Sequence, residues 1–513
     1  MNISHLFKQH PFRVILVLAV IIRLVAVIFS KGFGWFDDHF LIIEASQSWV
    51  DGYDYNRWLP GSEGNTGPGG HNFFYAGLHF IIFKFFSYIG FTDPQGKMYV
   101  VRLLHAALSL AVVVLGYRIT LKLSGQKGAN IAGLLLALLW LFPFISVRNL
   151  IEFTCVPFLL WGSWILMDKE KKRKLLLNGF LAGLVLGIAF CMRFQSMVYI
   201  GGIGLGLMLL GRWKEAFGTG FGVIVSAFLF MGSIDIFIWG YPFAELIEYI
   251  NYNMYNYAEY TVGPWYQYIL VLLLLTVPPV SFFLIFGYFY GFIKDWKKYI
   301  LIFLPVMLFL IFHSYYPNKQ ERFILPIVPF IIIAGTAGWL SFQEQSKFWL
   351  KRKMLNSILW GFFWLINISF LLVISTTYSK RARVESMTYL SKYPKIDNIL
   401  VENSNKAGIN LLPMYYLDQW VGYSEITNTK NAAAAKQWYI DYQINPPDFM
   451  IFEGENNLDV RLEEALEEFP GMVYETTISP GMIDRILFWL NPINENQNAY
   501  IYRNTYTRPK KIE

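Results

Sequence analysis

The chain has 513 residues, of which 55% are hydrophobic, 18% aromatic and only 15% charged. This apolar fraction exceeds that of ordinary soluble domains and indicates an integral membrane protein. The formal net charge of +7 does not indicate a nucleic-acid partner, because the lysines and arginines are distributed over many loops and form no single basic surface.

Apolar stretches along the chain predict about eleven membrane-spanning helices, so the expected fold class is an all-α polytopic membrane protein. Pro278 and Pro279 lie inside the eighth stretch and should kink it. The stretches are Val14–Phe29, Val100–Leu121, Ala129–Val147, Ile151–Met167, Leu175–Met192, Val198–Leu210, Thr219–Trp239, Tyr266–Ile293, Tyr299–Phe312, Phe323–Leu340 and Asn356–Leu372.

Basic residues occur in alternate loops between these stretches, for example Lys122 and Lys127 in one loop and Arg212 and Lys214 in another. In membrane proteins, short loops on the cytoplasmic side carry the excess of lysine and arginine. These basic loops are therefore expected on the cytoplasmic side of the membrane. The remaining loops would then lie on the outer face, and the most polar motifs of the membrane part fall at that side.

The segment 36–99 is expected to form a long outer loop that does not span the membrane. Its glycine-rich stretch 61–70 lacks the lysine and hydroxyl of a nucleotide-binding loop, so we interpret it as a flexible lid. Phe73–Tyr88 is apolar but interrupted by His79 and Lys84, which favours an interfacial helix.

After Leu372 the composition becomes that of a soluble protein. The expected organisation is therefore a membrane domain over 1–374 and a small soluble α/β domain over 375–513 on the outer face. Its predicted elements are the helix Leu458–Phe469 and strands at Asn398–Val401, Phe449–Glu453, Val473–Thr477 and Ala499–Tyr502.

The run from His313 to Phe323 places charged side chains between two long apolar stretches. Charge at a membrane boundary is usually functional. His313, Lys319 and Arg322 would line a cleft at the level of the lipid headgroups, and a group of cations there suits a phosphate. Further charged residues are expected at the same outer boundary, namely Asp37, Asp38, Arg148, Glu152 and Arg193.

The same run resembles a motif of the glycosyltransferase family 22 mannosyltransferases, which are GT-C enzymes that use dolichyl-phosphate mannose. The family pattern is His-Ser, a short spacer, Pro-His-Lys, then Glu-Arg-Phe and Leu-Pro. Asn318 replaces the second histidine, and it can donate a hydrogen bond but cannot carry a proton charge. The matching residues are His313-Ser314, Pro317, Lys319, Glu321-Arg322-Phe323 and Leu325-Pro326, and similar segments are Asp37-Asp38, Arg148 to Glu152, Arg193-Phe194-Gln195 and Gly263-Pro264-Trp265-Tyr266.

This resemblance implies a GT-C fold and transfer of a hexose, mannose in the first instance, from a polyprenyl or dolichyl phosphate to a glycolipid or glycan acceptor on the outer face. Such a transfer needs a base for the acceptor hydroxyl and cations for the departing phosphate. Asp37 is the predicted base and Asp38 the second candidate, and a single displacement would invert the anomeric centre. The alternative is that this acidic pair is an N-cap or a solvated turn.

Arg322 is predicted to bind the leaving phosphate bidentately, with Lys319 and His313 adding positive charge. The alternatives are that Arg322 pairs only with Glu321 or Glu152, and that Lys319 marks the membrane interface. Phosphate binding and these alternatives all place Arg322 and Lys319 at the same membrane boundary, so the sequence does not decide between them.

Other polar residues of the motifs are expected to support the site. Arg148, Glu152, Arg193 and Glu321 are interpreted as an ion network beneath it. The candidate substrate contacts are Asn318, Trp265 and Tyr266, although the two aromatic residues equally suit an interfacial belt.

Four possible metal ligands, Asp37, Asp38, His39 and Glu44, are close in sequence. Carboxylates together with phosphate oxygens are typical ligands of magnesium. Enzymes with lipid-phosphate donors in the family that the chain resembles generally work without a bound metal. We therefore expect no metal and no cofactor, with the lipid-phosphate sugar acting as donor substrate.

Two other functions remain open from the sequence: a GT-C transferase for another lipid-phosphate sugar, and a polytopic lipid or sugar transporter. Transporters commonly contain two repeated halves, and no such repeat is evident. The departures from the family pattern favour a bacterial plasma membrane, with the endoplasmic-reticulum membrane as the alternative. The active site is expected on the periplasmic, extracellular or lumenal side.

Overall fold

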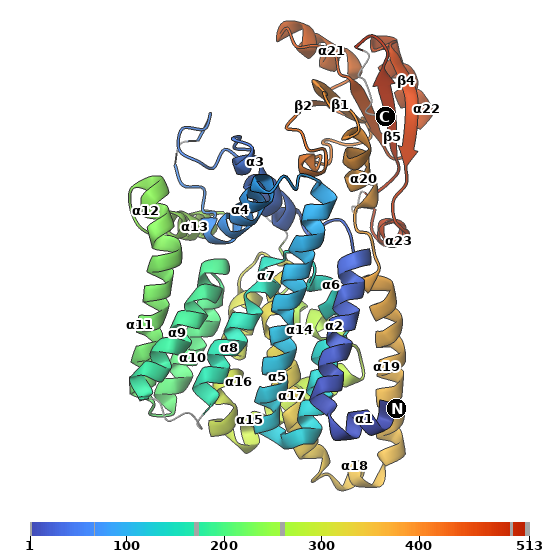
Figure 1. The fold of residues 1–513 in the computed structure, drawn as a ribbon. Coiled ribbons are helices and arrows are strands. Elements are labelled where there is room, and N and C mark those ends of the chain that lie inside the picture. The colour runs from blue at the N-terminus through green and yellow to red at the C-terminus, as the bar shows by residue number, and fades with distance from the viewer. Residues whose placement is uncertain (1–2, 66, 169–173, 257–261, 493–495, 508–513) are drawn as a thin grey trace. The chain divides into compact units, whose positions relative to one another are not determined.

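The computed structural model describes residues 3–65, 67–168, 174–256, 262–492 and 496–507 (Figure 1). These residues are mainly helical and divide into two compact units. Unit 1 comprises residues 1–28, 56–78 and 100–376, and unit 2 comprises 29–55, 79–99 and 377–513. Two segments of the expected outer loop therefore group with the C-terminal region, whose start at Thr377 is close to the expected residue 375.

The helices of the membrane part follow the apolar stretches closely, and each expected span is largely helical. In chain order they are α1 (Ile3–Gln9), α2 (Pro11–Phe29), α4 (Phe73–Tyr88), α5 (Pro94–Leu138), α6 (Leu141–Ile145), α7 (Ile151–Thr154), α8 (Val156–Met167), α9 (Leu175–Met192), α10 (Ser196–Leu209), α11 (Trp213–Ala227), η2 (Phe228–Gly232), α12 (Ser233–Trp239), α13 (Ala244–Tyr255), α14 (Gln267–Leu275), α15 (Val280–Lys294), α16 (Trp296–Tyr315), η3 (Glu321–Ile327), α17 (Val328–Gln343), α18 (Lys347–Lys351) and α19 (Lys353–Ser375).

Among the described residues, seven helices are long and apolar enough to cross a membrane, or eight if a bent pair counts as one span. The difference from eleven arises from length. Ile151–Met167 and Ser196–Leu209 are apolar but shorter than 18 residues. Two expected spans also lie in one helix, α5, which is interrupted at Gly125, where φ is 71° and glycine is favoured.

The predicted kink at Pro278-Pro279 is confirmed. Helices α14 and α15 meet there at an angle of 117°. Proline removes a backbone donor and cannot continue a straight helix, which accounts for the break in an otherwise apolar stretch.

Small residues let α9 and α11 approach each other closely. A Cβ atom added at Gly183 would lie 2.1 Å from the backbone oxygen of Thr219, and one at Gly222 would lie 2.3 Å from that of Phe180. In a membrane, where lipid is as apolar as leucine, such close backbone contact is a main source of helix association. The two helices thus form a tight seam within unit 1.

Unit 2 contains a five-stranded sheet of order β2-β1-β3-β5-β4 (Figure 1). Strand β1 is parallel to β2 and β3, whereas β5 is antiparallel to β3 and β4. The elements are η1 (Asp38–Glu44), α3 (Ala45–Val50), α20 (Arg381–Leu390), β1 (Asn398–Asn403), η4 (Met414–Tyr416), β2 (Gly422–Thr427), α21 (Ala432–Asp441), β3 (Phe449–Glu453), α22 (Leu458–Glu468), β4 (Met472–Ile478), α23 (Met482–Leu490) and β5 (Ala499–Asn504).

The core of this sheet domain follows the alternation of its strands. Leu400, Met450 and Phe452 point to one face and pack with Tyr439 of α21 and Ala465 of α22. Side chains two residues apart lie on the same face of a strand, so this alternation supplies one continuous apolar layer. The predicted small α/β domain is thus present, and its sheet includes the unpredicted strand β2.

Candidate active site

Glu152 of α7 is the centre of a buried ion cluster in unit 1. Its side chain is fully buried, and its Oε1 lies 3.1 Å from Nη2 of Arg193 and 3.5 Å from Nε of Arg322. One carboxylate thus faces two guanidinium groups, which leaves an excess of positive charge at this place. Arg322 is only 5% exposed, and its Nε also donates to Oε1 of Gln320 at 2.8 Å.

Arg322 is held by an irregular element. It lies in the 3₁₀ helix η3, directly before the long buried helix α17. The ring of Phe323 lies under both arginines, with its centroid 5.1 Å from the guanidinium carbon of Arg193 and 5.6 Å from that of Arg322. Stacking on an aromatic ring restricts a guanidinium plane, so these cations are held in fixed positions.

Lys319 is buried in the same run but is engaged differently. Its ammonium donates to the backbone oxygens of His313 at 2.6 Å and Ser314 at 2.9 Å, and also to that of Tyr316. An ammonium has three donors, and all three point to the carbonyls at the end of α16. Burial lowers the pKa of Lys319. This geometry supports a helix-capping role for Lys319, alongside the predicted role in phosphate binding.

His313 lies at the end of α16 and is buried. Its Nδ1 donates to the backbone oxygen of Phe309 at 2.9 Å, which leaves Nε2 as the nitrogen that can face a ligand. Tyr268 is close by, and its hydroxyl donates to the backbone oxygen of Gln320 at 3.2 Å. The ring of Tyr268 also lies 5.3 Å from Nζ of Lys319. The structure therefore brings His313, Lys319 and Arg322 together, as predicted.

Asn318 joins this run to the aromatic segment before α14. Its backbone forms a β-bridge with Val262, and the N–H of Gly263 donates to the oxygen of Pro317 at 3.3 Å. Within the described residues, the buried Oδ1 of Asn318 has no hydrogen-bond partner. A buried polar atom of this kind is costly unless it meets a ligand or solvent, which fits the predicted substrate contact.

Trp265 and Tyr266 follow this bridge and lie largely on the surface. Trp265 is 66% exposed and packs edge-on against Tyr266 with centroids 5.8 Å apart. Glu321, predicted to belong to the supporting network, is also exposed. These three side chains are thus exposed, whereas Glu152 and Arg322 are buried and Arg193 is partly buried.

Arg148 is buried on the turn before α7, with its guanidinium 4.6 Å from the ring centroid of Phe144. The turn is fixed by Tyr75 of α4, whose hydroxyl donates to the backbone oxygen of Asn149 at 2.8 Å and lies 2.6 Å from Nε2 of His105. These contacts explain how a four-residue helix such as α7 can hold Glu152 in place.

The end of the glycine-rich stretch is anchored to α13. The N–H of His71 donates to Oε2 of Glu245 at 2.8 Å, and Nε1 of Trp239 donates to Oε1 at 2.8 Å. Gly70 has a φ of +76°, and a Cβ there would lie 3.1 Å from the backbone of Tyr249. The predicted lid therefore has at least one fixed end among the described residues, and Thr66 within it lies outside them.

The predicted acids lie in unit 2, on and just before the π-helix η1. Asp37 is half-buried at the N-cap position, and its side chain makes no capping hydrogen bond. Asp38 is buried and begins η1. π-Helical segments are rare and occur frequently at functional sites. The role of Asp37 as the catalytic base stays a prediction.

A buried lock holds η1 in place within unit 2. Nε2 of His39 lies 3.0 Å from Oε1 of Glu44, and both carboxyl oxygens of Glu44 accept the backbone N–H of Tyr415, at 3.0 and 2.9 Å. The ring of His39 stacks between Phe33 and Tyr416. Burial raises the pKa of Glu44 and lowers that of His39, so burial favours the neutral form of each group.

Two of the four candidate metal ligands, His39 and Glu44, are engaged in the contacts of this lock. Among the residues that the structure describes, no group of three or more His, Cys, Asp or Glu side chains could hold a metal ion. His39 and Glu44 contact each other, whereas Asp37 lies at the start of η1 with its side chain half-buried.

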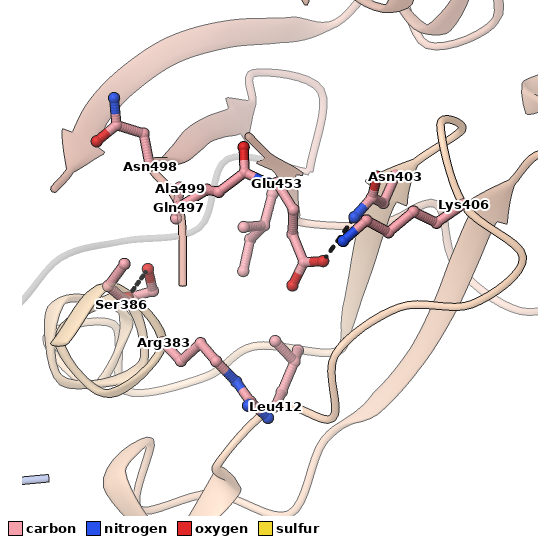
Figure 2. Close-up of a pocket in the computed structure, with 11 residues that line it drawn as sticks. Arg383, Ser386, Asn403, Lys406, Leu412, Glu453, Gln497, Asn498 and Ala499 are labelled. Carbon is pink, nitrogen blue, oxygen red and sulfur yellow. Dashed lines mark hydrogen bonds between the residues drawn. The ribbon is translucent and has the colours of Figure 1, made fainter. Parts of the chain in front are cut away.

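Unit 2 also contains a cavity at the carboxyl ends of β1 and β3, lined by both polar and apolar side chains (Figure 2). Glu453 points into it from the end of β3, and its carboxylate accepts hydrogen bonds from Asn403 at 3.0 Å and Asn410 at 3.1 Å. Burial raises the pKa of Glu453. Ligands commonly bind at this edge of α/β sheets. The cavity contains none of the predicted site residues, and its acid is already held by two amides, so we place the active site elsewhere.

Comparison with known families supports a membrane glycosyltransferase over a transporter. The model of the Alg9-like mannosyltransferase family matches residues 14–411, which include both groups of predicted site residues. The chain belongs to this family. The predicted resemblance is confirmed.

Individual relatives cover less of the sequence. GPI mannosyltransferase 3 of Saccharomyces cerevisiae is 26% identical over 243 residues, which are 43% of this chain and 38% of that protein. The enzyme of the same name from Kluyveromyces lactis is 25% identical over 240 residues, 43% of this chain and 39% of that protein. The matched region thus spans well under half the length of these relatives.

Solved structures confirm the predicted GT-C fold. ArnT from Cupriavidus metallidurans in the apo state has a TM-score of 0.63 at 11% identity, covering 98% of this chain and 99% of that one. The same enzyme bound to undecaprenyl phosphate has a TM-score of 0.59 at 10% identity, covering 97% and 98%. The Archaeoglobus fulgidus oligosaccharyltransferase has a TM-score of 0.53 at 11% identity, covering 90% and 72%.

Sequence reasoning missed several residues that contact the predicted site residues. Gln320 accepts a hydrogen bond from Arg322, Tyr268 supports the run from α14, and Tyr415 completes the lock on η1. Gln320 lies inside the charged run and could have been included. Tyr415 gave no signal, because it is 371 residues from Glu44.

Proposed function

We propose that this protein is a membrane mannosyltransferase that moves mannose from a polyprenyl phosphate to a glycolipid or glycan acceptor. The observation that carries the proposal is the cluster of Arg193 and Arg322 around the single carboxylate of Glu152, at the end of an apolar helix bundle. Two guanidiniums facing one carboxylate suit a site that receives a lipid phosphate, since phosphate completes the charge balance.

The chemistry follows from what each group can do. Asp37 would take the proton of the acceptor hydroxyl while the acceptor oxygen forms a bond to the anomeric carbon of the donor. The bond from that carbon to the phosphate oxygen breaks, and the phosphate leaves with its negative charge, which Arg322 stabilises. One displacement of this kind inverts the anomeric centre, so a β-linked donor gives an α-linked product.

The two groups of residues belong to different units of the chain. Asp37 and Asp38 lie in unit 2, and the phosphate-binding cations lie in unit 1. Both groups fall within residues 14–411, the range that the family model matches.

The test is a donor screen with purified full-length protein and defined lipid-phosphate sugars. Polyprenyl phosphates carrying mannose and glucose would be offered separately, and released polyprenyl phosphate and the new glycosidic linkage would be followed by NMR. Transfer from the mannose donor supports the proposal. Transfer only from another sugar would support a GT-C transferase with that donor specificity.

A transporter predicts a different result. Protein reconstituted in liposomes would then move labelled lipid-linked sugar across the bilayer without forming a glycosidic bond. This outcome, with no polyprenyl phosphate released from any donor, would overturn the proposed activity.

A further inference from the structure

Helix α23 of unit 2 exposes its apolar face. Met482, Ile486, Trp489 and Leu490 follow the spacing i, i+4, i+7 and i+8, which places them on one side of a helix. They are 66%, 43%, 79% and 65% exposed, respectively. In a helix that packs on a soluble core this stripe would be buried, so the arrangement is the reverse of the usual one.

The other side of α23 is fixed to the protein. Asp484 is buried, and its carboxylate accepts the backbone N–H of Lys380 at 3.0 Å and of Arg381 at 3.1 Å. The N–H of Gly481 also donates to this carboxylate, at 3.3 Å. With Asp484 held inward, the helix cannot rotate to bury Trp489 and Leu490, and the apolar stripe stays on the surface.

The anchoring segment directly follows a candidate membrane span. Helix α19 ends at Ser375, and Arg381 follows it by only six residues. An extended chain of that length covers at most about 20 Å. Because Asp484 is bonded to Lys380 and Arg381, chain connectivity alone keeps the start of α23 close to the membrane boundary, whatever the orientation of unit 2.

The composition of the exposed stripe suits that boundary. Tryptophan is enriched at the level of the lipid headgroups, where its ring is partly apolar and its N–H remains wet. Exposed Arg485 lies beside the stripe and can meet lipid phosphates. Methionine, isoleucine and leucine supply the part that enters the acyl region.

We propose that α23 is an interfacial helix that docks unit 2 on the surface of the lipid bilayer. Met482, Ile486, Trp489 and Leu490 insert below the headgroups, and Arg485 contacts lipid phosphate. The inference rests on the contacts of α23 and its connection to a span, and it holds whichever sugar the protein transfers.

The experiment places a fluorescent reporter on the helix in the full-length protein. Trp489→Cys would be labelled with a polarity-sensitive maleimide and reconstituted in phosphatidylcholine nanodiscs. The matched control is Val460→Cys on α22, because Val460 is also exposed, at 56%, but belongs to a helix with an acidic surface. Cys155 and Cys191 are buried, and labelling of the wild type measures their background.

The expected result is blue-shifted emission at position 489, with quenching by nitroxides on the lipid acyl chains and protection from aqueous iodide. Position 460 should respond in the opposite way. If Trp489→Cys fails to fold, Met482→Cys reports from the other end of the same stripe with the same expectation.

Two outcomes overturn the proposal. One is equal iodide quenching at 489 and 460 with no effect of the lipid nitroxides. The other is protection at 489 that disappears in nanodiscs holding a single copy of the protein, which would assign the stripe to contact between two copies.

Discussion

The two regions that carry the predicted chemistry hold their charged groups in opposite ways. In unit 1, Arg193 and Arg322 surround Glu152, so charges of opposite sign stabilise each other directly. In unit 2, Asp37 and Asp38 are placed by a lock of His39, Glu44 and Tyr415 that carries no net charge. In each region a short, irregular helix, η3 or η1, carries predicted site residues.

The difference matches the change of charge or protonation that each region would undergo in the proposed reaction. A phosphate site changes its charge when donor binds and leaves, and cations fixed by a shared carboxylate and an aromatic ring keep their positions through that change. A general base must gain and lose a proton, so its support should not titrate with it. Variants that remove the acids, the cations or the lock residues test this comparison between the two regions.

The largest effect is expected at the base. Asp37→Asn removes the proton acceptor but keeps the shape of the side chain, and transfer should fall by about a thousandfold. Asp38→Asn is the matched variant on the next residue. Initial rates of mannose transfer, normalised to folded protein by size-exclusion chromatography, measure both; full activity of Asp37→Asn would remove this residue from the mechanism.

The next effect concerns the phosphate side. Arg322→Gln should lower the transfer rate by about a hundredfold, because one preorganised charge is lost where negative charge develops. Lys319→Met is the matched change within the same run. Its three donors satisfy backbone carbonyls, so it should lower thermal stability and change the rate per folded molecule much less than Arg322→Gln.

These two variants sharpen the assignment of the cations. A rate loss for Lys319→Met as large as that for Arg322→Gln, at unchanged stability, would place Lys319 on the phosphate. A stability loss without a rate loss would confirm its capping role.

A smaller effect is expected from the neutral lock on η1. Glu44→Gln can still donate to His39 and accept the N–H of Tyr415, so transfer should change by less than about threefold. Glu44→Ala removes both contacts and should reduce transfer about tenfold by displacing the acids. Gln copies the shape and hydrogen bonds of a neutral glutamic acid. If transfer falls as much in Glu44→Gln as in Glu44→Ala, Glu44 is not neutral in the native protein.

The smallest effect is a pH dependence of stability in unit 1. Burial raises the pKa of Glu245, which lies outside the candidate spans, from its ordinary 4.5 to about 7, and the Asp235 carboxylate adds to the shift. A raised carboxyl pKa means that the favourable contribution is present below pH 4.5 and is lost as pH rises through 7. The thermal midpoint should therefore fall between pH 5 and pH 8.

Glu245→Gln is the control for that measurement. The variant cannot ionise, so its midpoint should be flatter over the same pH range. An identical slope in the variant would assign the dependence to other groups.

Much of the fold could be predicted because its signals are local. Long apolar stretches located the helices, and Pro278-Pro279 located the bend of 117°. Strand β2, Gly422–Thr427, was missed because glycine, serine and glutamate weaken the alternation of an edge strand. The count of eleven spans exceeds the seven or eight long helices because two apolar segments are too short to meet that length and two expected spans lie in the single helix α5.

The site was less accessible to sequence reasoning. The charged run and Asp37 stand out by composition, since charge between apolar stretches is costly. An ion network containing Glu152 and Arg193, and a pairing of Arg322 with Glu152, were among the predictions. That both arginines meet the same carboxylate required the structure, because one comes from the end of α9 and the other from η3. The capping of α16 by Lys319 was equally hidden, as it depends on how the chain turns after His313.

The glycine seam between α9 and α11 also bears on how the protein is made. Helix α9 is followed by α10, and α11 begins at Trp213, so the partner of Gly183 has not yet emerged when α9 leaves the ribosome. Until α11 emerges, the glycine face of α9 that will pack against α11 contacts only lipid or the insertion machinery. We expect α9 and α11 to join late in membrane insertion, after α10 has turned the chain back.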